Sequence, residues 1–323
     1  MVKLFQRRRD PSPAAIRRLG ISGAIFLVLV VLATLVSIPW TFGYAVEDGR
    51  PVSVRRFEAT NPEAVLRPPG LLGEPTGSYL LGSDHLGRDV LPRLLAGGGI
   101  SLAVGLAAAL TAVMVGTLWG VIAGTTTARI DGLMMRIVDV LYGLPYILIV
   151  VLLMVGVEGV VNRWGVAMDA ASAQWINVLT LWLAIGAVSW LTMARVIRGQ
   201  VLSLRSRPFM EAARAIGVPW RRQVLHHLLP NVLGPIMVYA TLTVPMAMLS
   251  EAFLSFLGIG IREPLPSWGN LAAGGLSQIN GVKSHWWLLL WPCLMIALTL
   301  LSLNCLGEWL RIRFDPRQRE QIA

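Results

Sequence analysis

Charged side chains are scarce in this sequence of 323 residues: Asp, Glu, Lys and Arg together make up 14%, whereas hydrophobic residues make up 55%. With a mean hydropathy of +0.63, this composition excludes an ordinary soluble domain, in which about a quarter of the residues are charged. Cysteine is rare too, because Cys293 and Cys305 are the only two. Both lie in one apolar block, where a helix would separate them by roughly 18 Å, too far for a disulfide bond. We expect them to pack within that block, without a redox role.

Lysine is nearly missing, since Lys3 and Lys283 are the only two in the chain. A phosphate-binding loop of the Walker A type needs a lysine after glycines at a fixed spacing, and neither lysine has that setting. The motifs H-E-x-x-H, C-x-x-C and G-x-S-x-G, which indicate metalloproteases, redox or metal sites and serine hydrolases, do not occur in the sequence either. The sequence therefore predicts no catalytic site, no bound cofactor and no hydrolysis of ATP by this chain.

The apolar residues gather in long blocks, as expected for membrane-spanning helices of about 20 residues. We predict an all-α polytopic membrane protein with six spans. They cover about 20–42, 100–124, 137–157, 176–194, 232–257 and 286–306. The first block is longer than the apolar run of about 7–15 residues in a cleaved signal peptide, so we expect it to stay as an anchor helix.

Basic residues are divided unevenly between the two sides of these spans. If both termini lie on one side, that side holds 19 of the 28 lysines and arginines, and the other side holds the remaining nine. Because basic residues are enriched on the cytoplasmic side of membrane proteins, we expect both termini in the cytoplasm and the chain in a cell (inner) membrane. The net charge of +10 then reflects this bias and contact with anionic membrane lipids. No nucleic-acid binding is expected, since the basic residues lack interleaved aromatic side chains.

This topology divides the chain into five segments. They are a basic cytoplasmic tail (1–19), the anchor helix (20–43), an extracytoplasmic loop (44–97), a core of five spans (98–307) and a second cytoplasmic tail (308–323). The extracytoplasmic loop ends in LGSDHLGRDVL (81–91), for which we predict an interfacial helix capped by Asp84. His85 and Asp89 are spaced like metal ligands, but no third ligand is near, so we predict no metal site.

Small residues follow one face of the second span. They recur at every fourth position: Ala108, Ala112, Gly116, Gly120 and Gly124. In lipid, such a face lets two helix backbones approach closely. The pattern predicts tight helix packing, within the chain or across a dimer, and indicates nothing about a substrate.

Two acidic residues in or near the spans are candidates for function. Asp139 begins the third span, where a paired carboxylate at the surface is favoured over a proton relay. Glu251 is the only acid deep within a predicted span. Because an intramembrane carboxylate is costly, Glu251 either pairs structurally or lines a transport path, and both interpretations stay open.

An arginine-rich loop, about 195–231, lies between the fourth and fifth spans. It predicts two short helices, 208–216 and 220–228, with Gly217 as a left-handed cap of the first and Pro219 at the start of the second. The stretch 212–219 is also similar to a DNA-binding helix-turn-helix, but the flanking membrane spans argue against that function. A loop in this position suits contact with a cytoplasmic protein.

The residues of this loop carry a family resemblance. Glu211-Ala212-Ala213, Gly217 and His227-Leu228-Leu229-Pro230-Asn231 resemble the cytoplasmic loop of ABC importer permeases, and the ending is similar to the peptide/nickel branch of that family. Further matches follow in the family's order: LGSDHLGRDV (81–90), LSFLGIG (254–260), PSWG (266–269) and GEWLRIRFDPR (307–317). The chain departs from the pattern at Glu308, where the family has Asp, and at Gly99, where it commonly has Arg.

The resemblance implies the six-helix fold of a type I ABC importer transmembrane domain. It also implies partners: a second permease subunit in a heterodimer, two cytoplasmic ATPases that use ATP and Mg, and an extracytoplasmic solute-binding protein. The residues that it assigns to coupling with the ATPases are Glu211, Ala212, Ala213, Gly217, Leu229 and Pro230. The solute would be a peptide or a related small molecule. An ion-coupled transporter or a membrane-embedded enzyme are the alternatives, but the spans show neither ionisable groups at the midplane nor a catalytic pair.

Overall fold

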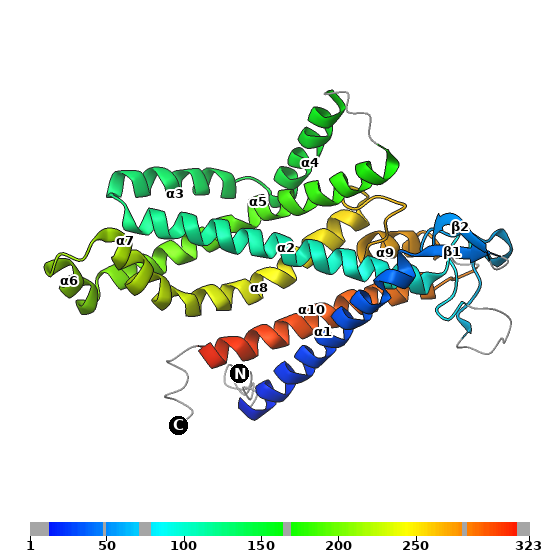
Figure 1. Cartoon of the computed structure of the whole chain (residues 1–323), viewed down its shortest axis with the longest axis horizontal. Helices are drawn as coiled ribbons and strands as arrows, with labels where there is room; N and C mark the ends of the chain where they lie inside the picture. Colours follow the sequence, from blue (N-terminus) through cyan, green and yellow to red (C-terminus); the bar gives the residue numbers. More distant parts are fainter. Residues whose placement is uncertain (1–12, 48–49, 71–78, 164–168, 280–282, 315–323) are drawn as a thin grey trace, which may run out of the picture.

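The computed structural model describes residues 13–47, 50–70, 79–163, 169–279 and 283–314. Long helices run along the long axis of the molecule (Figure 1). The helices α1 (Pro13–Thr41), α2 (Val90–Thr125), α5 (Ala170–Arg205), α8 (Leu229–Phe256) and α10 (Trp287–Phe314) are each part of a segment that is long and apolar enough to cross a membrane. Together with a bent pair of helices they supply up to six spans, which confirms the predicted fold class.

The bent pair corrects the bounds of the span that we predicted over about 137–157. The chain forms α3 (Ala128–Tyr142) and α4 (Tyr146–Arg163), which meet at an angle of 91°. Pro145 explains the break, because proline has no N–H donor and disfavours helical backbone in the residue before it. As a result α3 runs beside the bundle, whereas α4 projects away from it (Figure 1).

The start of α2 corrects a second prediction. The helix begins at Val90, ahead of the predicted start near residue 100, and the Asp89 carboxylate caps it by accepting a hydrogen bond from the backbone N–H of Leu91 (3.0 Å). Residues 81–89 form turns, so the interfacial helix predicted there is wrong. Asp84 accepts hydrogen bonds from the backbone N–H groups of Leu86 and Arg88 (both 2.9 Å) and thereby closes a turn.

The extracytoplasmic loop of our prediction holds a small amount of regular structure at one end of the bundle. Strands β1 (Tyr44–Glu47) and β2 (Arg50–Arg55) form an antiparallel hairpin, and a short 3₁₀ helix, η1 (Pro62–Ala64), follows. Phe57 fixes this region to the bundle, since it is fully buried and its ring lies 5.2 Å from that of Phe42. At the same end, α9 (Trp268–Leu276) packs between α8 and α10.

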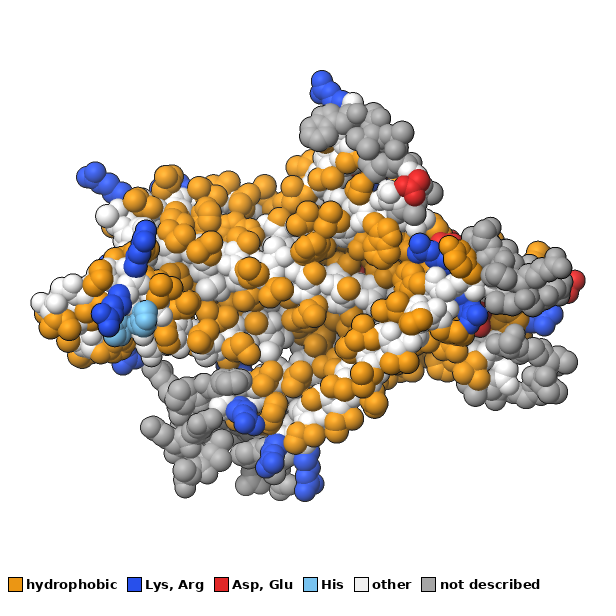
Figure 2. All heavy atoms as spheres, viewed as in Figure 1, with side chains coloured by type: hydrophobic (Ala, Val, Ile, Leu, Met, Phe, Trp, Pro, Cys, Tyr) orange, Lys and Arg blue, Asp and Glu red, His pale blue; other side chains and the backbone are white. Residues whose placement is uncertain are grey.

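The opposite end holds the arginine-rich loop, with α6 (Pro208–Ala215), α7 (Trp220–Arg222) and the π-helical segment η3 (Gln223–Leu228), which leads directly into α8. Figure 2 shows hydrophobic side chains over the middle of the visible face, with arginine and lysine gathered toward its ends. This distribution suits a bundle whose middle lies in lipid.

Candidate functional site

The small-residue face of α2 lies against α5 of the same chain. Ala108 and Ala112 are fully buried on this face. A Cβ atom on Gly116 would lie 2.7 Å from the carbonyl oxygen of Trp190, and one on Gly120 would lie 2.6 Å from that of Ala194. The two backbones therefore touch directly. Gly124 continues the face toward Val201.

Two arginines of α5 hold α3 in place. The guanidinium of Arg198 binds both carboxylate oxygens of Asp131, at 2.5 and 2.6 Å. Arg195 donates a hydrogen bond to Asp139 (2.7 Å) and stacks over the ring of Tyr142 at 4.1 Å. The prediction that Asp139 is paired near the surface is thus confirmed. Since α5 packs on α2, these contacts join α2, α3 and α5 into one unit at the end that carries α6.

The first short helix of the arginine-rich loop ends as the sequence predicts. Gly217 has a φ of +76°, in the left-handed region that favours glycine. The N–H of Val218 donates to the carbonyl of Ala213 and the N–H of Gly217 to that of Arg214, both at 3.0 Å. This pair of bonds is a Schellman motif, which fixes the direction of the chain after α6.

The faces of α6 differ from our prediction at one residue. Glu211 and Ala212 are exposed, but Ala213 is 5% exposed, so it does not lie on an outer docking surface. Ala213 shares the inner face of α6 with Met210, three residues earlier, which packs on the core formed with Val224 and Leu228. The outer side carries large apolar residues instead: Phe209 (43% exposed), Ile216 (80%) and Trp220 (52%).

The sequence predicts that Leu229, Pro230 and Asn231 turn the chain into the fifth span, but these residues form no turn. They lie inside one continuous helical run from Trp220 to Phe256, and Leu229 packs against the core that includes Val232. Because Pro230 has no N–H, a regular α-helix could not continue through it unchanged, and the π-helical segment η3 comes directly before it. The Asn231 side chain donates a hydrogen bond to the carbonyl of His227 (2.6 Å).

Hydrogen bonds connect α6 to the bundle. The guanidinium of Arg214 donates to the carbonyl of Arg205 at the end of α5 (2.8 Å). In turn, the guanidinium of Arg205 donates to the carbonyl of Gly124 at the end of α2 (2.7 Å). These two hydrogen bonds link α6 to the ends of α5 and α2.

Glu251 lies buried near the end of α8, beside residues of α2 and α9. Its side chain is fully buried and accepts a hydrogen bond from the Ser255 hydroxyl (2.9 Å), which itself accepts one from the N–H of Ile261 (3.0 Å). The adjoining cavity, lined also by Ser101 and Trp268, measures about 10 Å³, which is room for one water molecule at most. This setting favours structural pairing of Glu251 over a position on an open transport path.

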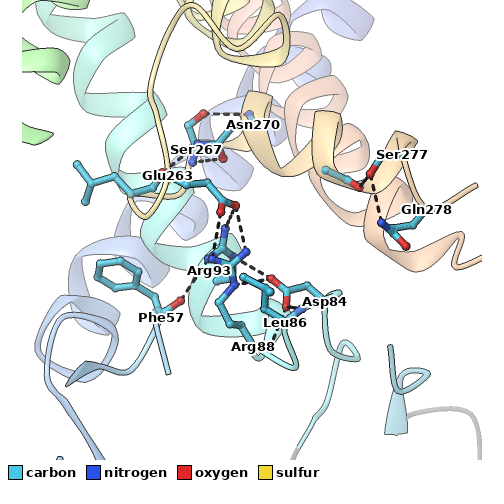
Figure 3. Close-up of polar contacts among 12 residues, drawn as sticks. Phe57, Asp84, Leu86, Arg88, Arg93, Glu263, Ser267, Asn270, Ser277 and Gln278 are labelled. Atoms are coloured by element: carbon cyan, nitrogen blue, oxygen red, sulfur yellow. Dashed lines mark hydrogen bonds and ion pairs between the residues drawn. The ribbon is translucent and has the colours of Figure 1, made fainter. Parts of the chain in front are cut away.

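A cluster of four charged residues, which the sequence did not reveal as a unit, lies at the end opposite α6 (Figure 3). Arg88 binds the Asp84 carboxylate (2.6 Å), and Arg88 and Arg93 each donate to Glu263 at 3.0 Å. The two arginines are 4% and 1% exposed, so the cluster is buried on the arginine side. It fixes the segment before α2 to the segment between α8 and α9. The only signal in the sequence was the i, i+4 spacing of Asp84 and Arg88, because Glu263 is 175 residues away from Arg88.

The arginines set the charge of Glu263. Its partial burial would by itself raise the pKa, but the hydrogen bond from Arg88 and the positive charges of Arg93 and Arg88 outweigh that effect. The pKa of Glu263 therefore lies below its usual value, and the carboxylate is ionised at neutral pH.

A groove of about 870 Å³ lies between the α3–α4 break and helices α5, α8 and α10. Hydroxyl and amide groups in it come from three helices, and they belong to Ser189, Thr192, Tyr239, Thr243, Ser250 and Asn304. Tyr142 and Tyr146 stand at the break itself.

Comparison with known proteins agrees with this architecture. The family model described as "binding-protein-dependent transport system inner membrane component" matches residues 116–320. The oligopeptide transport system permease protein OppC of Haemophilus influenzae is 37% identical over 300 residues, which cover 93% of this chain and 85% of that protein. The dipeptide transport system permease protein DppC of Bacillus subtilis is 42% identical over 245 residues, covering 76% and 71%. OppC of Salmonella typhimurium is 45% identical over 244 residues, covering 76% and 74%.

Among solved structures, an inward-facing form of the MetNI methionine ABC transporter matches with a TM-score of 0.54 and 18% identity, over 70% of this chain and 97% of that one. At that identity the likeness shows the fold alone. The family match and the relatives show more, because they cover most of the sequence. The chain belongs to the family of binding-protein-dependent transport system inner membrane components, as a membrane-spanning permease subunit of an ATP-driven importer and not an enzyme.

Proposed function

We propose that this permease imports peptides and that it shares the translocation path with a second, different permease subunit. The relatives named as oligopeptide and dipeptide permeases support the substrate class. The groove of about 870 Å³ supports the shared path, because it is open on one side and carries polar groups among apolar ones. In this proposal the groove is this chain's half of the path, and the partner permease supplies the other half.

The α6 end faces the cytoplasm in this proposal. Five arginines of the loop lie there: Arg205, Arg207, Arg214, Arg221 and Arg222. The start of α1 and the end of α10 lie toward the same end of the bundle (Figure 1), which supports a cytoplasmic position for both. In a chain without its native cysteines, Ser206→Cys should resist an impermeant thiol reagent in intact cells, whereas Thr60→Cys should react. Labelling of Ser206→Cys from outside would contradict this orientation and place the α6 end outside the cell.

The observation that carries the mechanism is the exposed apolar surface of α6 and its neighbours, formed by Phe209, Ile216 and Trp220 beside Glu211 and Ala212. Large apolar side chains at the aqueous end of a membrane protein indicate a protein partner. That partner is an ATPase subunit, which binds ATP and Mg; this chain binds neither.

Closure of two ATPases on ATP would move α6 as a rigid body. The Schellman motif and the buried Met210–Ala213 face hold α6 in one conformation, and the hydrogen bonds through Arg214 and Arg205 pass its displacement to α5 and α2. Because packed helices shift as units, the movement changes the groove between α5 and α8. Transport thus depends on a mechanical contact and not on chemistry within this chain.

Substitution at Ala212 tests this mechanism. Ala212→Trp places bulk on the exposed face without touching the buried face, so the complex should assemble in the membrane but lose peptide-stimulated ATP hydrolysis and uptake together. Ala212→Ser, which adds little volume, should keep both activities. Normal transport by Ala212→Trp with the ATPases attached would disprove the coupling role of α6. If no peptide from two to about ten residues stimulated ATP hydrolysis by the reconstituted parent complex, the substrate assignment would be wrong.

A further inference from the structure

A second polar cavity opens at the end of the bundle opposite α6. It measures about 440 Å³ and lies between α4, α5 and the segment that joins α8 to α9. Its volume falls within the range of about 300–1,000 Å³ that is usual for small-molecule sites. Six polar residues line it: Glu158, Gln174, Asn177, Thr180, Arg262 and Glu263.

An ion pair between Arg262 and Glu158 lies in the lining of this cavity, which we call the outer pocket. The guanidinium of Arg262 binds both oxygens of Glu158, at 3.0 and 3.2 Å, and so joins the segment after α8 to α4. The two side chains are 54% and 49% exposed. Exposed ion pairs contribute little to stability, so a ligand that offers both charges can replace this pair at low cost.

The other polar groups are arranged along the pocket. Gln174, Asn177 and Thr180 follow one another at three-residue intervals, which places them on one face of α5. Their amides and hydroxyl can donate and accept hydrogen bonds, as peptide groups require. Glu263 adds a carboxylate that is half exposed, although it also forms ion pairs with Arg88 and Arg93 (Figure 3).

We propose that this outer pocket receives a zwitterionic peptide before it enters the translocation path. Arg262 leaves Glu158 to bind the terminal carboxylate, Glu158 binds the terminal ammonium, and the α5 row binds the peptide groups. The exchange replaces one ion pair with two and leaves the net charge of the pocket unchanged. The inference rests on the proposed import of peptides. It adds that this chain recognises the two charged termini of the peptide and the peptide groups between them.

Thiol protection tests the pocket directly in the complete complex. Cys293 and Cys305 are replaced by serine, and Asn177→Cys is introduced as the reporter. Trialanine at about ten times its dissociation constant should slow modification of the reporter about tenfold, because it occupies the pocket. Trialanine amide, which lacks the carboxylate, should protect much less at the same concentration. The matched control Ser172→Cys lies on the first turn of α5 outside the pocket lining and should not be protected.

The role of Arg262 is tested by adding Arg262→Gln. Loss of a charge-assisted contact should remove the protection by trialanine and lower trialanine uptake by about tenfold. Arg163→Gln removes the same charge from the exposed end of α4 and should change neither. Absence of protection in a complex that imports trialanine would overturn the pocket alone, whereas absence of import of any peptide would overturn the proposed function. Protection by the solute-binding protein without peptide would assign the pocket to that protein and also overturn the inference.

Discussion

Replacement of Gly120 tests the close contact between the backbones of α2 and α5. A Cβ atom at this position would lie 2.6 Å from the carbonyl oxygen of Ala194 and 2.9 Å from the backbone nitrogen of Arg198. Both atoms belong to the backbone of α5, so no side-chain rotation can relieve the clash. Ordinary contact begins at 3.4 Å, and Gly120→Ala therefore requires α5 to move away by about 0.8 Å, the difference between 3.4 and 2.6 Å.

The cost follows from the packing around this position. A gap of about 0.5–1 Å removes a quarter to a half of the dispersion energy of each contact it opens. Ala108 and Ala112 lie fully buried along the same face, so the gap extends beyond Gly120. Overpacking of this kind costs about 1–3 kcal/mol, against a gain of at most about 1 kcal/mol from the better helix propensity of alanine. The free energy of unfolding therefore falls. Gly120→Leu should lower it further, although this variant should insert into the membrane normally.

Thermal unfolding of the purified permease complex measures this effect. Gly120→Ala should lower the unfolding midpoint by several degrees, and Gly120→Leu should lower it further and reduce the yield of complex. Gly199→Ala is the matched control on α5, because nothing lies within 4 Å of the added Cβ, and its midpoint should equal or exceed that of the parent. A midpoint for Gly120→Ala at or above the parent value would refute the argument from backbone contact.

Two further predictions concern the ends of helices. Gly217→Val forces a β-branched residue into the left-handed region, which costs about 1–2 kcal/mol. This variant should therefore impair peptide-stimulated ATP hydrolysis, whereas Gly217→Asn should keep most of that activity. Equal activity of the two variants would contradict the role of the cap. Burial raises the pKa of Asp89 from 3.8 to about 6, although the hydrogen bond from the N–H of Leu91 opposes the shift. Because the native state then binds the proton more tightly than the unfolded state, this group stabilises the fold below about pH 4, and that contribution is lost as the pH rises through 6. Asp89→Asn keeps the capping oxygen without the charge, so its unfolding midpoint should exceed that of the parent at pH 7.5 and match it near pH 4; a constant difference between the two across this range would contradict the raised pKa.

The sequence by itself determined the features that depend on local composition. The thickness of a membrane fixes the length of an apolar span, so the end of α1 and the start of α10 could be predicted to within one residue from hydropathy alone. The other ends of these two helices extend seven and eight residues beyond the predicted spans. The left-handed cap at Gly217 was equally predictable, because it depends on the φ preference of one glycine between a helical segment and a proline. The motifs of the arginine-rich loop indicated the family for the same reason, since their residues lie close together in the chain.

Only the tertiary structure decided which groups meet. It turned the third span through 91° at Pro145, placed Ala213 on the inner face of α6, and brought Glu263 to Arg88 and Arg93. The outer pocket likewise depends on Arg262 meeting Glu158, which is 104 residues away. A sequence pattern reports the preference of each segment for helix, turn or lipid. It does not report which segments pack together, because that depends on the complementary shape and charge of surfaces far apart in the chain.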